Sequence, residues 1–236
     1  MTLQPFPTDW QRALCIAAHP DDLEYGTAAA VATWTAAGRQ VDYLLVTRGE
    51  AGIATMAPEQ AGPVREQEER DGATEVGVTR VHFLDGFADG VLEADLRLRR
   101  ELARAIRVHR PEVVTTLTHA ESFPGGGLNQ ADHRAVGLTV LDAVAAAGNR
   151  WIFPELVEEG HEPWDGVRWV ASAAGHQPTH EVDVTDTFDR AVASLEAHRQ
   201  YLAALPADYP SPRQLLTGIL GGDEGRFAWR AQVWER

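Results

Sequence analysis

The chain has 236 residues, 44% of them hydrophobic and 24% charged, a globular composition long enough for one sizeable α/β domain. Its formal net charge of −14 argues against nucleic acid or an anionic membrane as the main partner, because either would need a basic face. The single cysteine, Cys15, excludes an internal disulfide and a cysteine-rich zinc site, and we expect it to be a small core residue.

The first half of the chain alternates strand and helix patterns. Apolar runs of buried-strand length occur at residues 13–18, 41–47, 80–85 and 112–118. Stretches of helical length and spacing lie between them, at residues 25–38, 58–76 and 93–109. Strands joined by helices of this length predict right-handed crossovers and a mainly parallel sheet that is covered on both faces.

The second half is less regular. We expect helices at residues 131–148 and 186–205, strands at 167–173 and 180–185, and a final strand or loop at 226–236. The chain has no internal repeat, low-complexity tract or linker, so we predict one domain, residues 1–236, with a Rossmann-like three-layer α/β/α fold. The N-terminus lacks a signal-peptide pattern and no apolar run reaches about 18 residues, which favours a soluble, cytoplasmic protein.

Two dense polar segments follow predicted strands. The sequence HPDD begins at His19, directly after the first strand, and residues 119–137 follow the fourth strand. In an open parallel sheet the ligand site lies outside the carboxyl ends of the strands. We therefore expect these two segments to meet at one site.

The residue types in these segments suit a metal ion. His19 and Asp22 are three residues apart, with Pro20 restricting the backbone between them, so an imidazole and a carboxylate can converge on one ion. His133, just inside the helix of the second segment, would be the third ligand. Two histidines and one carboxylate fit Zn²⁺, although Fe²⁺ and other divalent metals bind the same pattern.

With the metal held by these three residues, Asp21 could act as a general base. A carboxylate beside a metal ligand, but not on the metal, can take the proton of an activated water, which predicts metal-assisted hydrolysis. The structural alternative is that Asp21 or Asp22 caps the helix that follows, and that Asp132 caps the later helix in the same way.

Four motifs, in this order, resemble the PIG-L/LmbE superfamily of zinc-dependent deacetylases, which act on N-acetylglucosamine conjugates. They are AHPDD, TRGEAG, VREQEER and ADHRAVG, and the resemblance runs from about residue 13 to residue 203. It implies the same three metal ligands, with Asp21 as the general base. It also implies that Arg65 contacts the substrate, the alternative being a solvated helix charge.

One position departs from the family pattern. Many relatives read His-Pro-Asp-His in the second motif, and Gln130 here replaces the first histidine, which is thought to stabilise the oxyanion or act as an acid. A glutamine amide can donate a hydrogen bond to an oxyanion but cannot be an acid. Either Asp21 performs both proton transfers or another histidine replaces the acid, and the candidates are His119, His176, His180 and His198. Asp132 would orient a neighbouring group.

Three consecutive glycines lie in residues 123–130, beside the predicted site. Such a loop is mobile or tightly turned, and we expect it to form the rim of the pocket, with Gly126 and Asn129 contacting substrate. The alternative is a plain turn.

These features predict a zinc-dependent hydrolase that removes an N-acetyl or small N-acyl group from an amino-sugar conjugate such as an N-acetylglucosamine derivative. An amidase of a larger conjugate, such as a thiol–sugar S-conjugate or an antibiotic intermediate, would use the same residues. A sugar- or metal-binding relative without catalysis is the non-enzymatic alternative. The expected partner is a small amino sugar, with no nucleic acid and no membrane, and the resemblance is compatible with a homo-oligomer.

Overall fold

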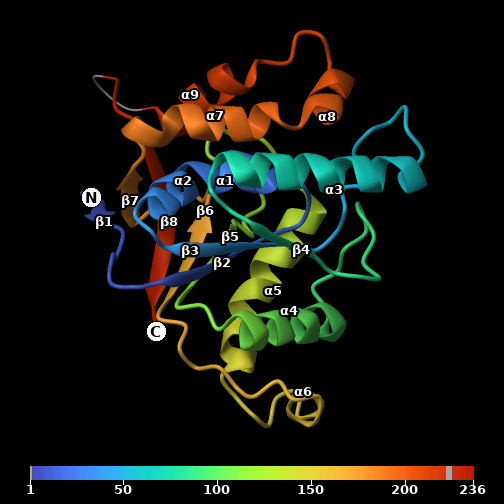
Figure 1. Cartoon of the computed structure of the whole chain (residues 1–236), viewed down its shortest axis with the longest axis vertical. Helices are drawn as coiled ribbons and strands as arrows, with labels where there is room; N and C mark the ends of the chain where they lie inside the picture. Colours follow the sequence, from blue (N-terminus) through green and yellow to red (C-terminus); the bar gives the residue numbers. More distant parts are fainter. Residues whose placement is uncertain (1, 222–224) are drawn as a thin grey trace.

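The computed structural model describes residues 2–221 and 225–236, which form one eight-stranded sheet with helices on both faces (Figure 1). The strands are β1 (Gln4–Pro5), β2 (Arg12–Ala17), β3 (Gln40–Leu45), β4 (Arg80–Phe83), β5 (Val113–Leu117), β6 (Trp169–Ala173), β7 (His180–Asp183) and β8 (Ala228–Glu235). Their order is β1-β7-β8-β6-β5-β2-β3-β4. Strand β8 is antiparallel to both of its neighbours, β6 and β7, whereas the other paired strands are parallel.

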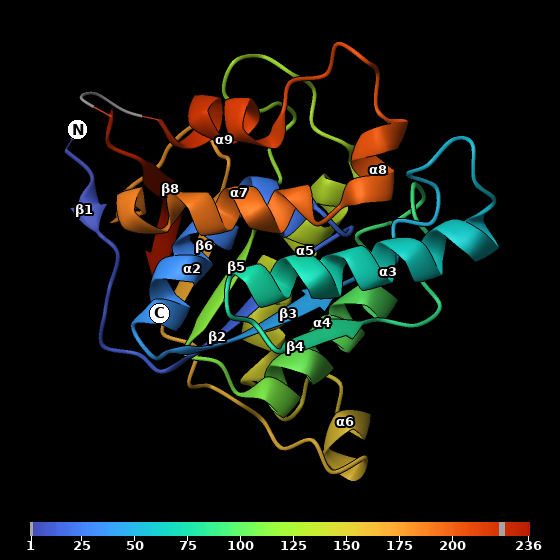
Figure 2. The same ribbon diagram turned by 45° about the horizontal axis from the view of Figure 1, so that its top comes forward.

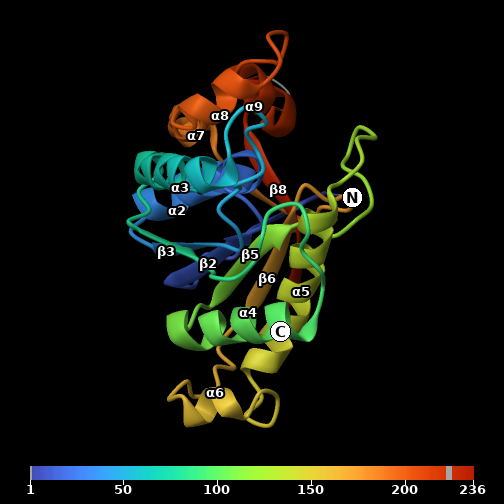
Figure 3. The same ribbon diagram turned by 90° about the vertical axis from the view of Figure 1, so that its right-hand side faces the viewer.

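The helices divide between the two faces of the sheet. Those on one side are α1 (Asp22–Gly26), α2 (Ala28–Ala36), α3 (Pro58–Glu75), α7 (Phe188–Glu196), α8 (Arg199–Ala204) and α9 (Pro212–Leu220). Those on the other side are α4 (Leu96–His109), α5 (Ala131–Ala147) and the short α6 (Glu155–Glu158). Figure 3 shows the two groups separated by the sheet. In the described part of the chain, every helix is too short or too polar to cross a bilayer.

The core has two parts because the sheet is apolar on both faces, as expected for a mainly parallel sheet. One buried cluster joins the sheet to α2 and α7, and the other joins it to α4 and α5. The first contains the edge-to-face rings of Trp10, Trp34 and Trp229, with centroids 5.2 and 5.5 Å apart along the row. Cys15 is fully buried in β2, in agreement with its predicted core role.

The predicted fold class is confirmed, and each predicted strand is present with ends that differ by at most two residues. The C-terminal tail, for which both a strand and a loop were considered, forms β8. The sequence pattern did not reveal β1, α6 or α9. Strand β1 and helix α6 have only two and four residues, whereas α9 has nine and carried a usable signal, the capping box of Ser211 and Gln214 with Pro212 at its first position.

Two predicted helices are broken by buried polar groups. The helix expected at 25–38 divides at Thr27 into α1 and α2, where the Trp229 indole donates to the carbonyl of Gly26 at 2.7 Å. The helix expected at 186–205 ends at Glu196, and α8 begins only at Arg199. The intervening His198 is fully buried. Figure 2 shows the ribbon changing direction between α7 and α8.

A buried arginine secures the layer formed by α4 and α5. Arg107 is 2% exposed, and its guanidinium donates to carbonyls at and beyond the C-terminal end of α5, including Ala147 at 3.1 Å and Asn149 at 2.9 Å. The same two carbonyls also accept the backbone N–H groups of Trp164 and Ile152, so the guanidinium adds hydrogen bonds that join the C-terminal end of α5 to the segment after it.

We expect Arg107→Met to lower the free energy of unfolding by about 3 kcal/mol, since it keeps the aliphatic volume but removes every donor. Arg104→Met is the matched control on the same helix. Arg104 is 34% exposed and pairs with Glu159 at the surface, so its loss should cost less than about 1 kcal/mol. Urea unfolding of both variants measures the difference, and equal midpoints would contradict the proposed role of Arg107.

Candidate active site

The first polar segment forms a tight turn at the end of β2. Asp21 adopts a left-handed backbone conformation with φ of 90°, and Asp22 begins α1. The Asp22 side chain folds back on this turn, where Oδ2 accepts the backbone N–H groups of Ala18 at 3.1 Å and His19 at 2.8 Å. These two hydrogen bonds fix the carboxylate and leave Oδ1 free to face the second segment.

Helix α5 brings His133 to the same place. The helix lies so close to the end of β5 that a Cβ on Gly137 would come within 2.6 Å of the Leu117 carbonyl oxygen. Glycine at this position therefore permits the approach that places His133, one turn earlier, beside Asp22. Both side chains are buried, with exposures of 7% and 5%.

Asn129 determines which nitrogen of His133 carries a proton. The Asn129 amide donates to the carbonyls of Thr118 at 2.8 Å and Ala120 at 2.9 Å, which orients its oxygen toward His133 Nδ1 at 3.0 Å. Because that oxygen is an acceptor, Nδ1 must be the donor. In the neutral imidazole the lone pair is then on Nε2.

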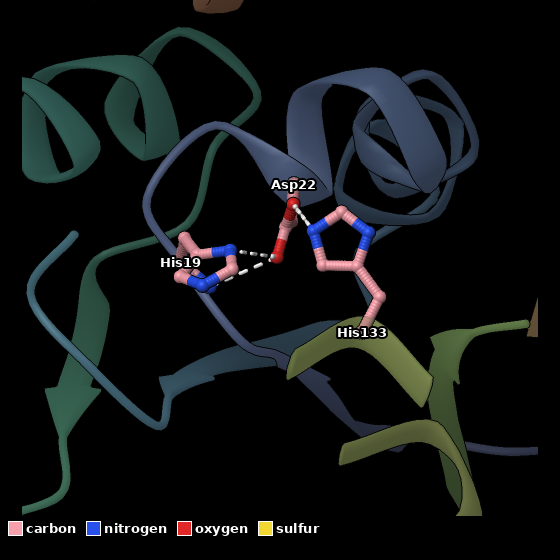
Figure 4. A group of neighbouring side chains, drawn as sticks. All are labelled: His19, Asp22 and His133. Carbon is pink, nitrogen blue, oxygen red and sulfur yellow. Dashed lines mark hydrogen bonds and ion pairs between the residues drawn. The ribbon is translucent and has the colours of Figure 1, made fainter. Parts of the chain in front are cut away.

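The His133 Nε2 lone pair faces another acceptor. Nε2 lies 2.9 Å from Asp22 Oδ1, yet it has no hydrogen-bond partner among the described residues (Figure 4). Two buried lone pairs at this separation repel each other unless a positive charge lies between them, either a proton or a metal ion. This arrangement fits a metal site.

His19 completes the group from the opposite side. Its Nε2 lies 3.1 Å from Asp132 Oδ2 and 3.0 Å from Asp89 Oδ1, so in the neutral imidazole, the form that binds a metal, Nε2 is the donor and the lone pair is on Nδ1. Nδ1 lies 3.5 Å from Asp22 Oδ2. Ligand atoms on one tetrahedral zinc ion are separated by about 3.3 Å, so His19, Asp22 and His133 could hold a divalent ion after small adjustments.

The electrostatics of the site favour a cation. Burial lowers the pKa of the His19 imidazole, but the surrounding carboxylates, Asp22 first, outweigh burial and raise it to about 12. Burial raises the pKa of Asp22, whereas the two imidazoles lower it well below the usual range. The carboxylates that stabilise a proton on His19 also favour a metal cation at this place, and the net charge of −14 acts in the same direction.

Asp21 is paired with an arginine rather than with the three candidate ligands. Its carboxylate lies 3.1 Å from Arg65 Nη2 and borders the cavity described below. Burial is the largest influence and raises the pKa of Asp21 above its ordinary value, although the Arg65 guanidinium opposes the change. A carboxylate with a raised pKa is better matched to proton transfer near neutral pH.

Helix α3 holds the unusual backbone of Asp21 from one side. Arg65 donates to the carbonyl of Pro20, and Glu69, one turn later on α3, accepts the N–H of Asp21 at 3.1 Å. Both polar groups of the Pro20–Asp21 peptide are thus bound by side chains of the same helix, and we call this arrangement the α3 clamp. The imidazole of the buried His198 lies 3.8 Å from Glu69.

The structure separates the other predicted residues into two groups. Arg65 and Gln130 line the cavity, and Gln130 is exposed at the N-terminus of α5. Gly126 lies in the exposed loop with φ of 94°, outside the cavity lining. Asn129 is also outside the lining, and its amide is fully used by His133 and two carbonyls.

The four histidines considered as replacement acids occupy different places. His176 borders the cavity, with Nε2 2.9 Å from the carbonyl of Ser122. His198 is fully buried between Glu24 and Glu69. His119 and His180 are not part of the cavity lining.

Sequence reasoning missed Asp89 and Glu69. Asp89 lies in the loop after β4, which has no recognisable pattern, and it contacts both His19 and the N–H of Ala51. Glu69 carried a usable signal, since it lies four residues after Arg65 on a predicted helix and the two must share a face.

The candidate ligands open onto a cavity of about 940 Å³. Its polar end contains His19, Asp21, Asp22, Arg65, Asp89 and His133. One part of the remaining wall is formed by α8, α9 and the segment between them, and another by the segment after β6 and by β8, together with Phe123 and Pro124 of the glycine-rich loop. The predicted rim therefore comes partly from that loop and partly from C-terminal helices that the motifs did not include.

Residues 14–144 match the PIG-L family, described as GlcNAc-PI de-N-acetylase. The chain is 30% identical over 207 residues to diacetylchitobiose deacetylase of Thermococcus kodakarensis, covering 87% of this chain and 74% of that protein. It is 28% identical over 188 residues to 1D-myo-inositol 2-acetamido-2-deoxy-alpha-D-glucopyranoside deacetylase of Streptomyces scabiei, covering 69% of this chain and 55% of that protein.

The fold is shared with a crystal structure. N,N'-diacetylchitobiose deacetylase from Pyrococcus horikoshii, complexed with its inhibitor MPG, superposes with a TM-score of 0.85 over 96% of this chain and 85% of that chain. Sequence identity between the two is 22%, so this likeness concerns the fold alone.

Proposed function

The chain belongs to the PIG-L family of GlcNAc-PI de-N-acetylases, and we propose that it removes the N-acetyl group from an amino-sugar conjugate. The observation that carries the proposal is the buried pair of acceptors, His133 Nε2 and Asp22 Oδ1, 2.9 Å apart beside Asp21. Such a pair suits a metal-dependent hydrolase, in which a cation and an adjacent base act on one water molecule.

His19, Asp22 and His133 would hold the ion, and Zn²⁺ best suits two imidazoles and one carboxylate. When bound, the cation would lower the pKa of a water molecule and polarise the amide carbonyl. Asp132 supports the site indirectly, because its carboxylate keeps the proton of His19 on Nε2 and leaves Nδ1 available as a ligand.

The chain supplies the proton transfers. Asp21 accepts a proton from the attacking water and then delivers it to the amine as the C–N bond breaks, which requires no second acid. The Gln130 amide borders the same cavity and donates a hydrogen bond to the developing oxyanion. The products are acetate and the free amino sugar.

The test is release of acetate and of a primary amine from N-acetylglucosamine, its glycosides and N,N'-diacetylchitobiose. Protein loaded with Zn²⁺ should release both products in equal amounts. A protein that binds the metal but leaves every amide intact would be the non-catalytic relative instead.

Metal binding should also be visible without turnover. Adding Zn²⁺ to chelator-treated protein should raise the melting temperature by several degrees, since a ligand that binds only the folded state stabilises it. Asp22→Asn should abolish the shift because it removes a charged ligand, whereas Asp85→Asn, a change at a surface ion pair, should leave the shift intact. A shift retained in Asp22→Asn would place the ion elsewhere.

A further inference from the structure

One wall of the active-site cavity is apolar. It consists of Leu205 and Tyr209, which follow α8, and of Leu215 and Ile219 on α9. Leu215 and Ile219 are four residues apart and therefore lie on one face of the helix. The next residues along the chain, Leu216 and Leu220, are buried against the core, and Leu220 also borders the cavity, so α9 has one broad apolar surface that packs on the core along one side and faces the cavity along the other.

This wall leaves large apolar groups in contact with solvent. Tyr209 is 41% exposed and Ile219 is 46% exposed, and both border the same cavity as the candidate metal ligands. Isolated exposed apolar side chains are common, but several that converge on one cavity indicate a surface that a ligand covers.

The size of the cavity shows which part of the substrate can reach the wall. At about 940 Å³, it is near the upper end of the roughly 300–1,000 Å³ found for pockets that hold drug-sized ligands. An acetyl group held between the metal ligands and Asp21 fills little of this space. The amine side of the substrate must occupy the remainder.

The polar groups are distributed unevenly around the cavity. The carboxylates and the Arg65 guanidinium cluster at the metal end, and His176 and Arg230 border the cavity from the sheet side. Among the residues of α8, α9 and the segment between them that border the cavity, Tyr201 and Tyr209 carry hydroxyls, and the Tyr201 ring packs against Arg65 at the metal end. A second sugar against the remaining, mainly aliphatic part of the wall would lose water from its hydroxyls and gain few partners, whereas an alkyl or aryl group would gain by burial.

We propose that the α8–α9 wall is a subsite for an apolar aglycone, so that the substrate is an N-acetylated amino sugar carrying an alkyl or aryl group. This inference rests on the proposed function. It concerns the amine side of the substrate, and the acyl group stays small.

The test compares methyl and hexyl glycosides of N-acetylglucosamine, in both anomers, with N,N'-diacetylchitobiose as a polar substrate of similar size. The hexyl-to-methyl ratio of kcat/KM should be roughly 30 for the preferred anomer. That value is about twofold for each of five methylenes, less than the roughly fourfold that complete burial would give. N,N'-diacetylchitobiose should be turned over more slowly than the hexyl glycoside.

Ile219→Asp should lower the hexyl-to-methyl ratio at least fivefold, because it places a charge in the wall. Leu138→Asp is the matched control, since Leu138 is also helical and 44% exposed but lies on α5 outside the cavity. It should leave the ratio unchanged. An N-hexanoyl substrate with a methyl aglycone should not show the gain, and a gain there would overturn the assignment to the aglycone.

The possible failures are distinguishable. Turnover of the methyl glycoside with a ratio near one, or a high ratio that survives Ile219→Asp, would overturn the subsite and leave the proposed function intact. Absence of turnover for every glycoside would overturn the proposed function. In that case the affinities of the hexyl and methyl glycosides, measured by calorimetry, test the subsite separately. Equal affinities would overturn the proposed subsite as well.

Discussion

Asp21→Asn should lower kcat for hydrolysis of an N-acetylated amino sugar by roughly 10²- to 10⁴-fold, the usual contribution of a positioned general base. The asparagine keeps the size of the side chain, and its amide can still contact Arg65, but it cannot accept the proton of the attacking water. Asp21 is not among the three candidate ligands, so the variant should bind one metal ion per chain with unchanged affinity.

The comparison with Asp22→Asn makes this result specific. The two carboxylates are adjacent in sequence and similarly buried, at 5% exposure each, yet they face different partners. Asp22→Asn should lose the metal, whereas Asp21→Asn should keep it and lose turnover. Steady-state kinetics and elemental analysis of the purified variants separate the two effects. A metal-free Asp21→Asn, or one that retains more than about a tenth of the wild-type kcat, would assign Asp21 a different role.

The sequence predicted the site best where chemically reactive residues directly follow a recognisable strand. The HPDD segment follows an apolar strand directly, so its position at a strand end could be read from hydrophobic spacing alone. The meeting of His19 and His133, more than a hundred residues apart, followed from the rule that parallel strands direct their carboxyl ends to one edge.

Other features depend on contacts that no sequence pattern encodes. The contact of Asn129 with substrate stays a prediction. The orientation of its amide toward His133 could not be predicted, because it depends on a side-chain rotamer and on two nearby carbonyls. Asp89 reaches His19 from an irregular loop. The C-terminal strand β8 lies between β6 and β7 in the sheet. This position could not be predicted, because pairing between strands distant in sequence leaves no local turn pattern.

The α3 clamp combines a predicted residue with a contact that was not predicted. Asp21 was predicted to be the general base, and the sequence pattern did not predict that Glu69 binds its backbone N–H. A left-handed conformation at a residue other than glycine costs of order 1–3 kcal/mol and persists only where its surroundings impose it. Asp21 has this conformation, and the Glu69 carboxylate accepts its N–H. Burial, followed by the nearby Glu24 carboxylate, raises the pKa of Glu69 well above its usual range, but the carboxyl group accepts a hydrogen bond in either protonation state.

We therefore expect Glu69→Ala to lower kcat by roughly 10- to 100-fold, which corresponds to release of about 1–3 kcal/mol of backbone strain and loss of the productive carboxylate position. Glu69→Gln should retain most of the activity, because the amide oxygen can still accept the N–H of Asp21. Rescue by glutamine distinguishes a positioning role from a need for negative charge at this site. KM should change less than kcat, since Glu69 does not line the cavity.

Glu66→Ala is the matched control on the same helix. Glu66 pairs with Arg48 and Arg70 and makes no contact with the turn at Asp21 among the described residues, so its removal should alter kcat by less than about twofold. Melting temperatures of all three variants show whether a loss of activity merely follows unfolding. A folded Glu69→Ala with the wild-type kcat would mean that the turn keeps its left-handed conformation without the clamp, and that the sequence around Pro20 alone determines where Asp21 points.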